Sequence, residues 1–150
     1  MQEEFAVEEV LKGYALVLGK CEGEVLATLQ PIAFAGGVDP STGRINDPKH
    51  DLFRQSVSNK VLAFPHGKGS SATSLFIAEL VRINKAPLAI INIHTEPILA
   101  AGALISKHFY NKVIPILVLE KESFHRLKTG QRVLVDATCG SVTILGHASV

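Results

Sequence analysis

The residues best suited to chemistry lie in a glycine-rich segment that also carries several hydroxyl groups, Phe64-Pro65-His66-Gly67-Lys68-Gly69-Ser70-Ser71-Ala72-Thr73-Ser74. It follows a short apolar run, 61–64, and precedes an amphipathic one, 75–83. This order predicts a strand, a glycine turn and the start of a helix. Unpaired N–H groups and the helix dipole make such a helix start favourable for anions. The segment could hold an anionic substrate, activate a serine by stabilising its alkoxide, or do both.

The same segment also has a purely structural interpretation. Serine and threonine are ordinary helix caps, and glycine is common in a turn between a strand and a helix. The segment is not a P-loop, because Gly69 rather than serine or threonine follows Lys68. It also lacks the Gly-x-Ser-x-Gly pattern of a nucleophile elbow. Spacing alone leaves both interpretations open.

The metal-ligating residue types show no ligand spacing. Cys21 and Cys139 are far apart, lack a Cys-x-x-Cys pattern and are too few to hold an iron–sulfur cluster. The six histidines show no His-x-x-x-His spacing. We therefore expect no metal site and no cofactor bound by this chain alone. The sparse cysteines and an acidic beginning unlike a signal peptide favour the cytoplasm.

The composition predicts one domain with a substantial core. The chain has 150 residues, of which 47% are hydrophobic and only 19% charged. Buried parallel strands, a surface covered by a partner protein, or both would explain so little charge. The net charge of +1, without a basic patch, argues against nucleic acid. The apolar run 86–105 contains Asn92, His94 and Glu96, which argues against a membrane span.

The elements that would position the glycine turn follow from the apolar runs and their punctuation. Strands are predicted over 11–18, 24–29, 61–64, 87–93, 113–119, 132–136 and 141–145, and helices over 71–84, 96–108 and 121–128. We expect Gly13 to form a bulge and Thr95 to cap the second helix. The polar segment 36–50 is expected to be an ordered loop. The pattern predicts a single α/β domain over residues 1–150, with a mixed sheet or partial barrel.

Two long motifs in this order resemble the small subunit of aconitase X. They are Gly36-Gly37-Val38-Asp39-Pro40-x-Thr42-Gly43-x-Ile45-x-Asp47-x-x-His50 and Val61-Leu62-x-Phe64-Pro65-x-Gly67-Lys68-Gly69-Ser70-Ser71. The segments Ala86-Pro87-x-Ala89 and Glu96-Pro97-Ile98 also fit, so the resemblance spans nearly the whole chain. It implies a swivelling β/β/α domain, like the mobile fourth domain of aconitase.

The resemblance also implies a hydro-lyase that is active only with a larger partner subunit carrying an iron–sulfur cluster. Within the family, the similarity is greatest to enzymes of the archaeal mevalonate pathway, which dehydrate (R)-5-phosphomevalonate to trans-anhydromevalonate 5-phosphate. Ser70 matches the serine that acts as the base in aconitases. Aconitases have an arginine directly after the two serines, where this chain has Ala72. Carboxylate recognition must therefore come from elsewhere.

Several neighbouring residues remain open between substrate binding and a structural role. Ser71 is the alternative to Ser70 as the base. The candidates for binding a small anionic substrate are Gly69, Ser71, Lys68, His66 and Asp39. For the polar side chains the alternatives are a solvated turn, a cap or core position, and local hydrogen bonds that shape the loop. Glu96 is interpreted as the acid that begins a helix.

Two other functions remain possible for the same residues. One is a different aconitase X dehydratase that acts on a hydroxyproline-type acid and uses the same base. The other is a non-catalytic module that holds an anion at the glycine turn.

Overall fold

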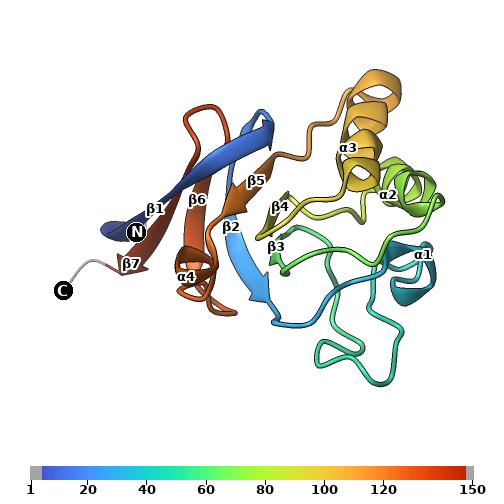
Figure 1. Ribbon diagram of the computed structural model, residues 1–150, viewed down its shortest axis with the longest axis horizontal. Coiled ribbons are helices and arrows are strands. Elements are labelled where there is room, and N and C mark those ends of the chain that lie inside the picture. The colour runs from blue at the N-terminus through green and yellow to red at the C-terminus, as the bar shows by residue number, and fades with distance from the viewer. Residues whose placement is uncertain (1–4, 148–150) are drawn as a thin grey trace, which may run out of the picture.

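Four neighbouring strands run parallel, and three further strands close them into a barrel. In the computed structural model, which describes residues 5–147, the strand order is β1-β5-β4-β3-β2-β6-β7 (Figure 1). The strands are β1 (Phe5–Val17), β2 (Lys20–Ala27), β3 (Lys60–Ala63), β4 (Ala89–Asn92), β5 (Ile116–Leu119), β6 (Arg132–Asp136) and β7 (Ser141–His147). The helices are α1 (Phe34–Gly37), α2 (Thr73–Arg82), α3 (Pro97–Tyr110) and α4 (Lys121–Phe124). Strands β2 to β5 are parallel, and β1, β6 and β7 pair antiparallel with their neighbours.

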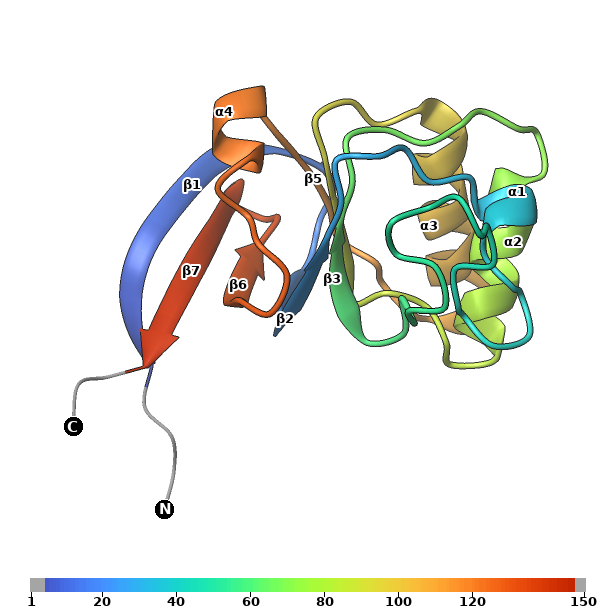
Figure 2. The same ribbon diagram turned by 90° about the horizontal axis from the view of Figure 1, so that it is seen from below.

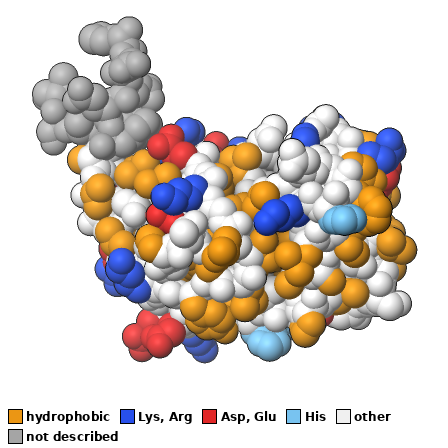
Figure 3. Space-filling model, turned by 90° about the horizontal axis from the view of Figure 1, so that it is seen from above, with side chains coloured by type: hydrophobic (Ala, Val, Ile, Leu, Met, Phe, Trp, Pro, Cys, Tyr) orange, Lys and Arg blue, Asp and Glu red, His pale blue; other side chains and the backbone are white. Residues whose placement is uncertain are grey.

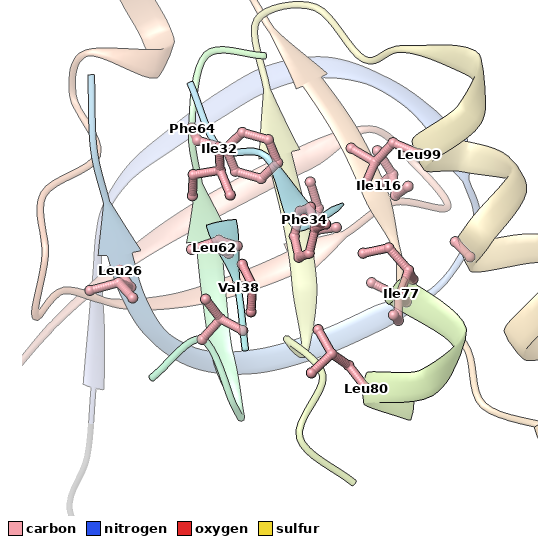
Figure 4. Close-up of a cluster of buried hydrophobic side chains, with 14 of the residues drawn as sticks. Leu26, Ile32, Phe34, Val38, Leu62, Phe64, Ile77, Leu80, Leu99 and Ile116 are labelled. Atoms are coloured by element: carbon pink, nitrogen blue, oxygen red, sulfur yellow. The ribbon is translucent and has the colours of Figure 1, made fainter. Parts of the chain in front are cut away.

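The parallel strands are buried on both faces because they separate two hydrophobic cores. Side chains alternate across a strand, so Val61 and Ala63 belong to the core inside the barrel, whereas Leu62 and Phe64 belong to the core outside it. Figure 4 shows this outer core, in which Leu62 and Phe64 lie among side chains from the helices. The rings of Phe34 and Phe64 have centroids 5.9 Å apart. This double burial explains the continuous apolar runs in the sequence.

Helices α2 and α3 cover the outer face of the parallel strands. Ile77, Leu80 and Val81 of α2 are buried at helical spacing, as expected for an amphipathic helix. The two helices approach closely at Gly102, where a Cβ would lie 2.9 Å from the Cβ of Ile77. No helix within residues 5–147 is both long and apolar enough to cross a membrane.

The expected mixed sheet is confirmed, and it closes completely because the long β1 pairs with β5 at one end and with β7 at the other. Two expectations about local structure are corrected. Gly13 forms no bulge: it pairs regularly with Leu119, and a Cβ there would overlap the carbonyl oxygen of Val118. Thr95 does not cap α3, because its hydroxyl donates to Asn92 Oδ1 at 2.8 Å.

The long polar segment is an ordered loop, as expected. Asp39 and Asp47 each accept the N–H group of the residue two positions later, at 2.8 and 2.9 Å. These Asx turns fold the backbone locally. Farther along, Ile45, Leu52 and Val57 are buried in the outer core and anchor the loop to the domain.

Candidate active site

Three loops lie side by side where the parallel strands β2, β3 and β4 end (Figure 2). They are residues 28–33 after β2, residues 64–72 after β3 and residues 93–96 after β4. The Lys68 N–H group donates to the Ile32 carbonyl at 3.1 Å, and the Ile93 N–H group donates to the Pro65 carbonyl at 3.0 Å. Ligands of α/β sheets bind at this carboxyl edge. We call residues 65–72 the glycine turn.

Ser70 is placed by the glycine turn at the start of α2. Its Oγ accepts the Ala72 N–H group at 3.2 Å, and its carbonyl accepts the Thr73 N–H group at 3.1 Å. The N-cap residue Ala72 has no side chain that could cap the helix, so the Ser70 hydroxyl serves this end of α2. An N–H group donated to Oγ and the helix dipole both favour negative charge on that oxygen. The position therefore suits a serine that must act as a base.

The start of α2 also keeps polar groups without partners. Within residues 5–147, the N–H groups of Ser71 and Ser74 make no hydrogen bond, and the buried hydroxyl of Thr73 has no partner. Free N–H groups at a helix N-terminus bind anions, and a buried hydroxyl without a partner costs stability. These groups lie next to Ser70 in the chain. The arrangement can accommodate an anion.

Four of the predicted site residues share this turn with Ser70. Gly69 is the neighbouring residue, and Ser71 is exposed, with a hydroxyl that makes no hydrogen bond within residues 5–147. Lys68 is exposed and has no ion pair in the described part of the chain. His66 is exposed, and its Nδ1 donates to the Gly67 carbonyl at 2.8 Å, because a carbonyl oxygen can only accept. Lys68 and His66 therefore offer donors close to Ser70 in the chain.

Asp39 does not join this group. Its Oδ1 accepts the N–H and hydroxyl groups of Ser41 at 2.8 and 2.6 Å, and these bonds hold the pKa of Asp39 below its usual value. Ser41 borders a hollow with Arg82 and Lys85, at the C-terminal end of α2. The ten residues of α2 span about 15 Å, so Ser70 lies at the other end. Asp39 shapes the long loop.

The long loop reaches the carboxyl edge through its later residues. His50 Nε2 donates to the Pro31 carbonyl at 3.1 Å, while His50 Nδ1 accepts the Leu52 N–H group at 3.1 Å. This pair of bonds fixes a neutral tautomer, so the 3.2 Å contact between Nδ1 and Asp51 is not an ion pair. Asp51 instead accepts the Thr28 hydroxyl at 2.7 Å. The loop thereby supports the segment after β2, which in turn contacts the glycine turn.

Glu96 is the residue at this edge that the sequence interpretation assigned only to a helix start. It is the N-cap residue of α3 but makes no side-chain cap bond. A Cβ built at Gly69 would lie 3.1 Å from Glu96 Oε2, and one built at Gly67 would lie 3.9 Å from the same atom. The carboxylate therefore lies against the glycine turn. The sequence shows Glu96 a few residues after an apolar strand, but the position of β4 next to β3 is seen in the structure.

The described residues do not gather a metal site. Within residues 5–147, no group of three or more His, Cys, Asp or Glu side chains is placed to hold a metal ion. Burial raises the pKa of the Cys21 thiol to about 11, which disfavours the thiolate that ligates metals. Cys139 is a free, exposed thiol. These donors do not fit an iron–sulfur cluster.

Comparisons with known proteins agree with the fold. A family model described as the aconitase X swivel domain matches residues 10–144. The phosphomevalonate dehydratase small subunit of Methanosarcina mazei is 45% identical over 135 residues, which is 89% of this chain and 90% of that protein. The protein of the same name from Thermococcus kodakarensis is 45% identical over 135 residues, covering 90% of this chain and 96% of that protein. The crystal structure of Thermococcus kodakaraensis aconitase X in its holo-form has a TM-score of 0.83 at 45% identity, covering 93% of this chain and 100% of that chain. This chain therefore belongs to the aconitase X swivel domain family.

Proposed function

We propose that this chain is the small subunit of a phosphomevalonate dehydratase, a hydro-lyase whose active site is completed by a larger subunit. The names of two relatives that match nearly the whole chain support the substrate and the subunit organisation. The observation that carries the proposal is the Ser70 hydroxyl, which accepts the Ala72 N–H group at the start of α2. We also propose that the complex works in the cytoplasm.

In the proposed reaction, Ser70 accepts a proton from the substrate. (R)-5-Phosphomevalonate loses a proton from the carbon beside its carboxylate and a hydroxyl from the next carbon. The electrons of the broken C–H bond form the double bond, and the product is trans-anhydromevalonate 5-phosphate with one molecule of water. A serine oxygen can take that proton only if negative charge on it is stabilised. The Ala72 N–H group and the α2 dipole supply this stabilisation.

The substrate carries a carboxylate and a phosphate, and the glycine turn offers groups that suit both. Lys68 supplies a positive charge, and the Ser71 N–H group supplies a donor close to the positive end of the α2 dipole. His66 can add a further donor from its exposed ring. Gly69 has no side chain, which lets a ligand approach the backbone. We propose these residues as the substrate-binding part of this chain.

The departing hydroxyl needs a Lewis acid. Within residues 5–147, no group of three or more His, Cys, Asp or Glu side chains is placed to hold a metal ion that could serve as one. We propose that an iron–sulfur cluster on the larger subunit supplies this Lewis acidity. Apolar side chains that remain exposed support a partner surface: Tyr14 is 60% exposed, Leu104 56% and Phe109 70%. Figure 3 shows hydrophobic side chains reaching the surface across one whole face of the domain.

The test is an assay of the two-subunit complex. The chain would be co-expressed with a candidate large subunit from the same genome, purified as a complex and incubated with (R)-5-phosphomevalonate. We expect a product lighter by one water, and no product from this chain alone. A complex that dehydrates a hydroxyproline-type acid but not phosphomevalonate would replace the proposed substrate. A complex that binds phosphomevalonate without turnover would indicate an anion-binding module.

A further inference from the structure

The Glu96 carboxylate lies in the space that side chains would occupy if Gly67 and Gly69 carried them. A Cβ built on Gly69 would lie 3.1 Å from Glu96 Oε2, and one built on Gly67 would lie 3.9 Å from the same atom. Both glycines precede Ser70 in the same turn, and α2 begins three residues after Ser70, at Thr73. Two loops from neighbouring parallel strands therefore bring a carboxylate and a serine hydroxyl to one edge of the sheet.

Folding makes little use of this carboxylate. Glu96 is half-buried, yet within residues 5–147 it forms no ion pair and no side-chain hydrogen bond, and it does not cap its own helix. Several other glutamates form ion pairs, for example Glu22 with Arg132 and Glu79 with Arg82. Partial burial of a carboxylate without a partner costs folding free energy, so a functional role would explain why the carboxylate is there.

The charge of Glu96 limits what that function can be. A carboxylate repels the carboxylate and phosphate of the proposed substrate, so it cannot be the group that binds them. It can accept a proton or a hydrogen bond. The Ser70 oxygen already accepts the Ala72 N–H group, while the Ser70 hydroxyl proton has no acceptor within residues 5–147. Glu96 must be ionised before it can accept a proton. It is the N-cap residue of α3, an end of a helix where the dipole favours negative charge.

We infer that Glu96 is the proton acceptor that works through Ser70, an inference that rests on the proposed dehydratase function. As the Ser70 oxygen takes the proton from the substrate carbon, the Ser70 hydroxyl proton passes to a Glu96 oxygen. The C–H electrons form the double bond and the C–O bond breaks. The departing hydroxide then takes the proton held by Glu96 and becomes water, so both side chains return to their starting state. Such hydrogen bonds often tighten only when substrate is bound.

Glu120 provides a matched control. Like Glu96, it follows a parallel strand of the sheet, it is the N-cap residue of its helix, α4, and it makes no side-chain cap bond. Unlike Glu96, it is exposed, and no glycine of the turn would meet it through a Cβ. An effect of Glu96 on capping or on general surface charge should therefore appear equally at Glu120.

The experiment compares Glu96→Gln, Glu96→Asp and Glu120→Gln in the purified two-subunit complex with phosphomevalonate. We expect Glu96→Gln to lower kcat by about 10² to 10⁴-fold with little change in KM, because the amide cannot hold the proton. Glu96→Asp should recover part of the rate. Glu120→Gln should stay within about twofold of the wild type, the range in which a solvated surface charge acts. Thermal unfolding of each variant checks the fold.

The split between kcat and KM, together with rescue by Glu96→Asp, separates proton transfer from a structural role. A structural role would shift the thermal unfolding curve of Glu96→Gln along with its rate, whereas a role in proton transfer lowers kcat and leaves the curve in place. An active wild type with an unchanged Glu96→Gln rate would overturn this inference alone. An inactive wild-type complex would overturn the proposed function and, with it, this inference.

Discussion

Ile32 pairs with Gly67 across a parallel bridge, which fastens the loop after β2 to the turn that carries Ser70. The bridge consists of two bonds: the Ile32 N–H group donates to the His66 carbonyl at 3.3 Å, and the Lys68 N–H group donates to the Ile32 carbonyl at 3.1 Å. The Ile32 side chain is only 2% exposed and lies in the outer core beside Phe34 and Phe64 (Figure 4). Because the Ile32 side chain is fixed in the packed core, its backbone bonds hold the glycine turn in place before substrate binds, which preorganises the site.

Replacement of Ser70 by alanine should abolish turnover of the two-subunit complex. The variant removes the oxygen that accepts the Ala72 N–H group and that we propose as the base, so kcat should fall by about 10² to 10⁴-fold. Because the same oxygen serves the start of α2, the variant should also lose about 1 kcal/mol of stability. The measurements are steady-state kinetics with phosphomevalonate and urea unfolding.

Ser71→Ala is the matched control for that experiment. Ser71 is exposed, and its hydroxyl makes no hydrogen bond within residues 5–147, so its loss should leave kcat and stability nearly unchanged. If Ser71→Ala is inactive while Ser70→Ala keeps its rate, the base has been assigned to the wrong serine.

Much of the fold could be predicted because the barrel is built from strongly patterned segments. The β6 strand was predicted with the observed bounds, Arg132–Asp136, since alternation and flanking glycines mark both ends. Closure of the barrel depends on β1 pairing with both β5 and β7, contacts between residues 99 or more positions apart. Local patterns carry no information about such pairings. For the same reason Gly13 was expected to form a bulge, whereas it faces the backbone of β5.

The candidate site could be predicted only in part. Residues that share one turn, such as Lys68 and Ser70, are close because they are neighbours in the chain. Asp39 belongs to a motif of the resemblance, but its loop turns it toward the other end of α2. The contact between Glu96 and Gly69 crosses two loops, so it depends on the order of β3 and β4 in the sheet. Sequence spacing could not specify that order.

Gly69→Ala should impair activity through Glu96. The new methyl group would lie 3.1 Å from Glu96 Oε2 and displace the carboxylate, whose flexible side chain can move at little cost to folding. We expect a clear loss of kcat with nearly unchanged unfolding. In a Glu96→Ala background the same methyl group meets no carboxylate, so the part of its effect that acts through Glu96 should vanish and only hindrance of substrate approach should remain. A double-mutant cycle on kcat measures this coupling, and fully additive effects would argue that the contact has no functional role.

Thr73→Val and Thr95→Val should have opposite effects on stability, although both remove a buried hydroxyl. The Thr73 hydroxyl has no partner within residues 5–147, so its removal should leave the free energy of unfolding unchanged or raise it by about 1 kcal/mol. The Thr95 hydroxyl donates to Asn92 Oδ1 at 2.8 Å, and its loss leaves that oxygen buried and unpaired, at a cost of about 1–3 kcal/mol. Urea unfolding of both variants is the test. Destabilisation by Thr73→Val alone would mean that its hydroxyl is hydrogen-bonded in solution.

Asp39→Asn should change the pH dependence of stability without changing kcat. Hydrogen bonds from the Ser41 hydroxyl and N–H groups lower the pKa of Asp39 from its usual 3.8, so the folded state favours the ionised form. That contribution is fully present above the unfolded pKa and is lost as the pH falls through the lower, folded pKa. The variant should therefore melt below the wild type at pH 7, and the two melting temperatures should converge as the pH falls below 3.8, through the lowered pKa of Asp39.

The rate is the second half of that prediction, because it separates a loop-shaping residue from a substrate-binding one. Asp39 lies toward the C-terminal end of α2, whereas Ser70 lies at its N-terminal end. The loss of one solvent-exposed charge that far from Ser70 should be screened by water and salt, so KM and kcat should both stay close to the wild type. A large rise in KM, with the melting curve unchanged, would show that Asp39 meets the substrate in the assembled complex. The long loop would then have to close onto the carboxyl edge when the larger subunit binds.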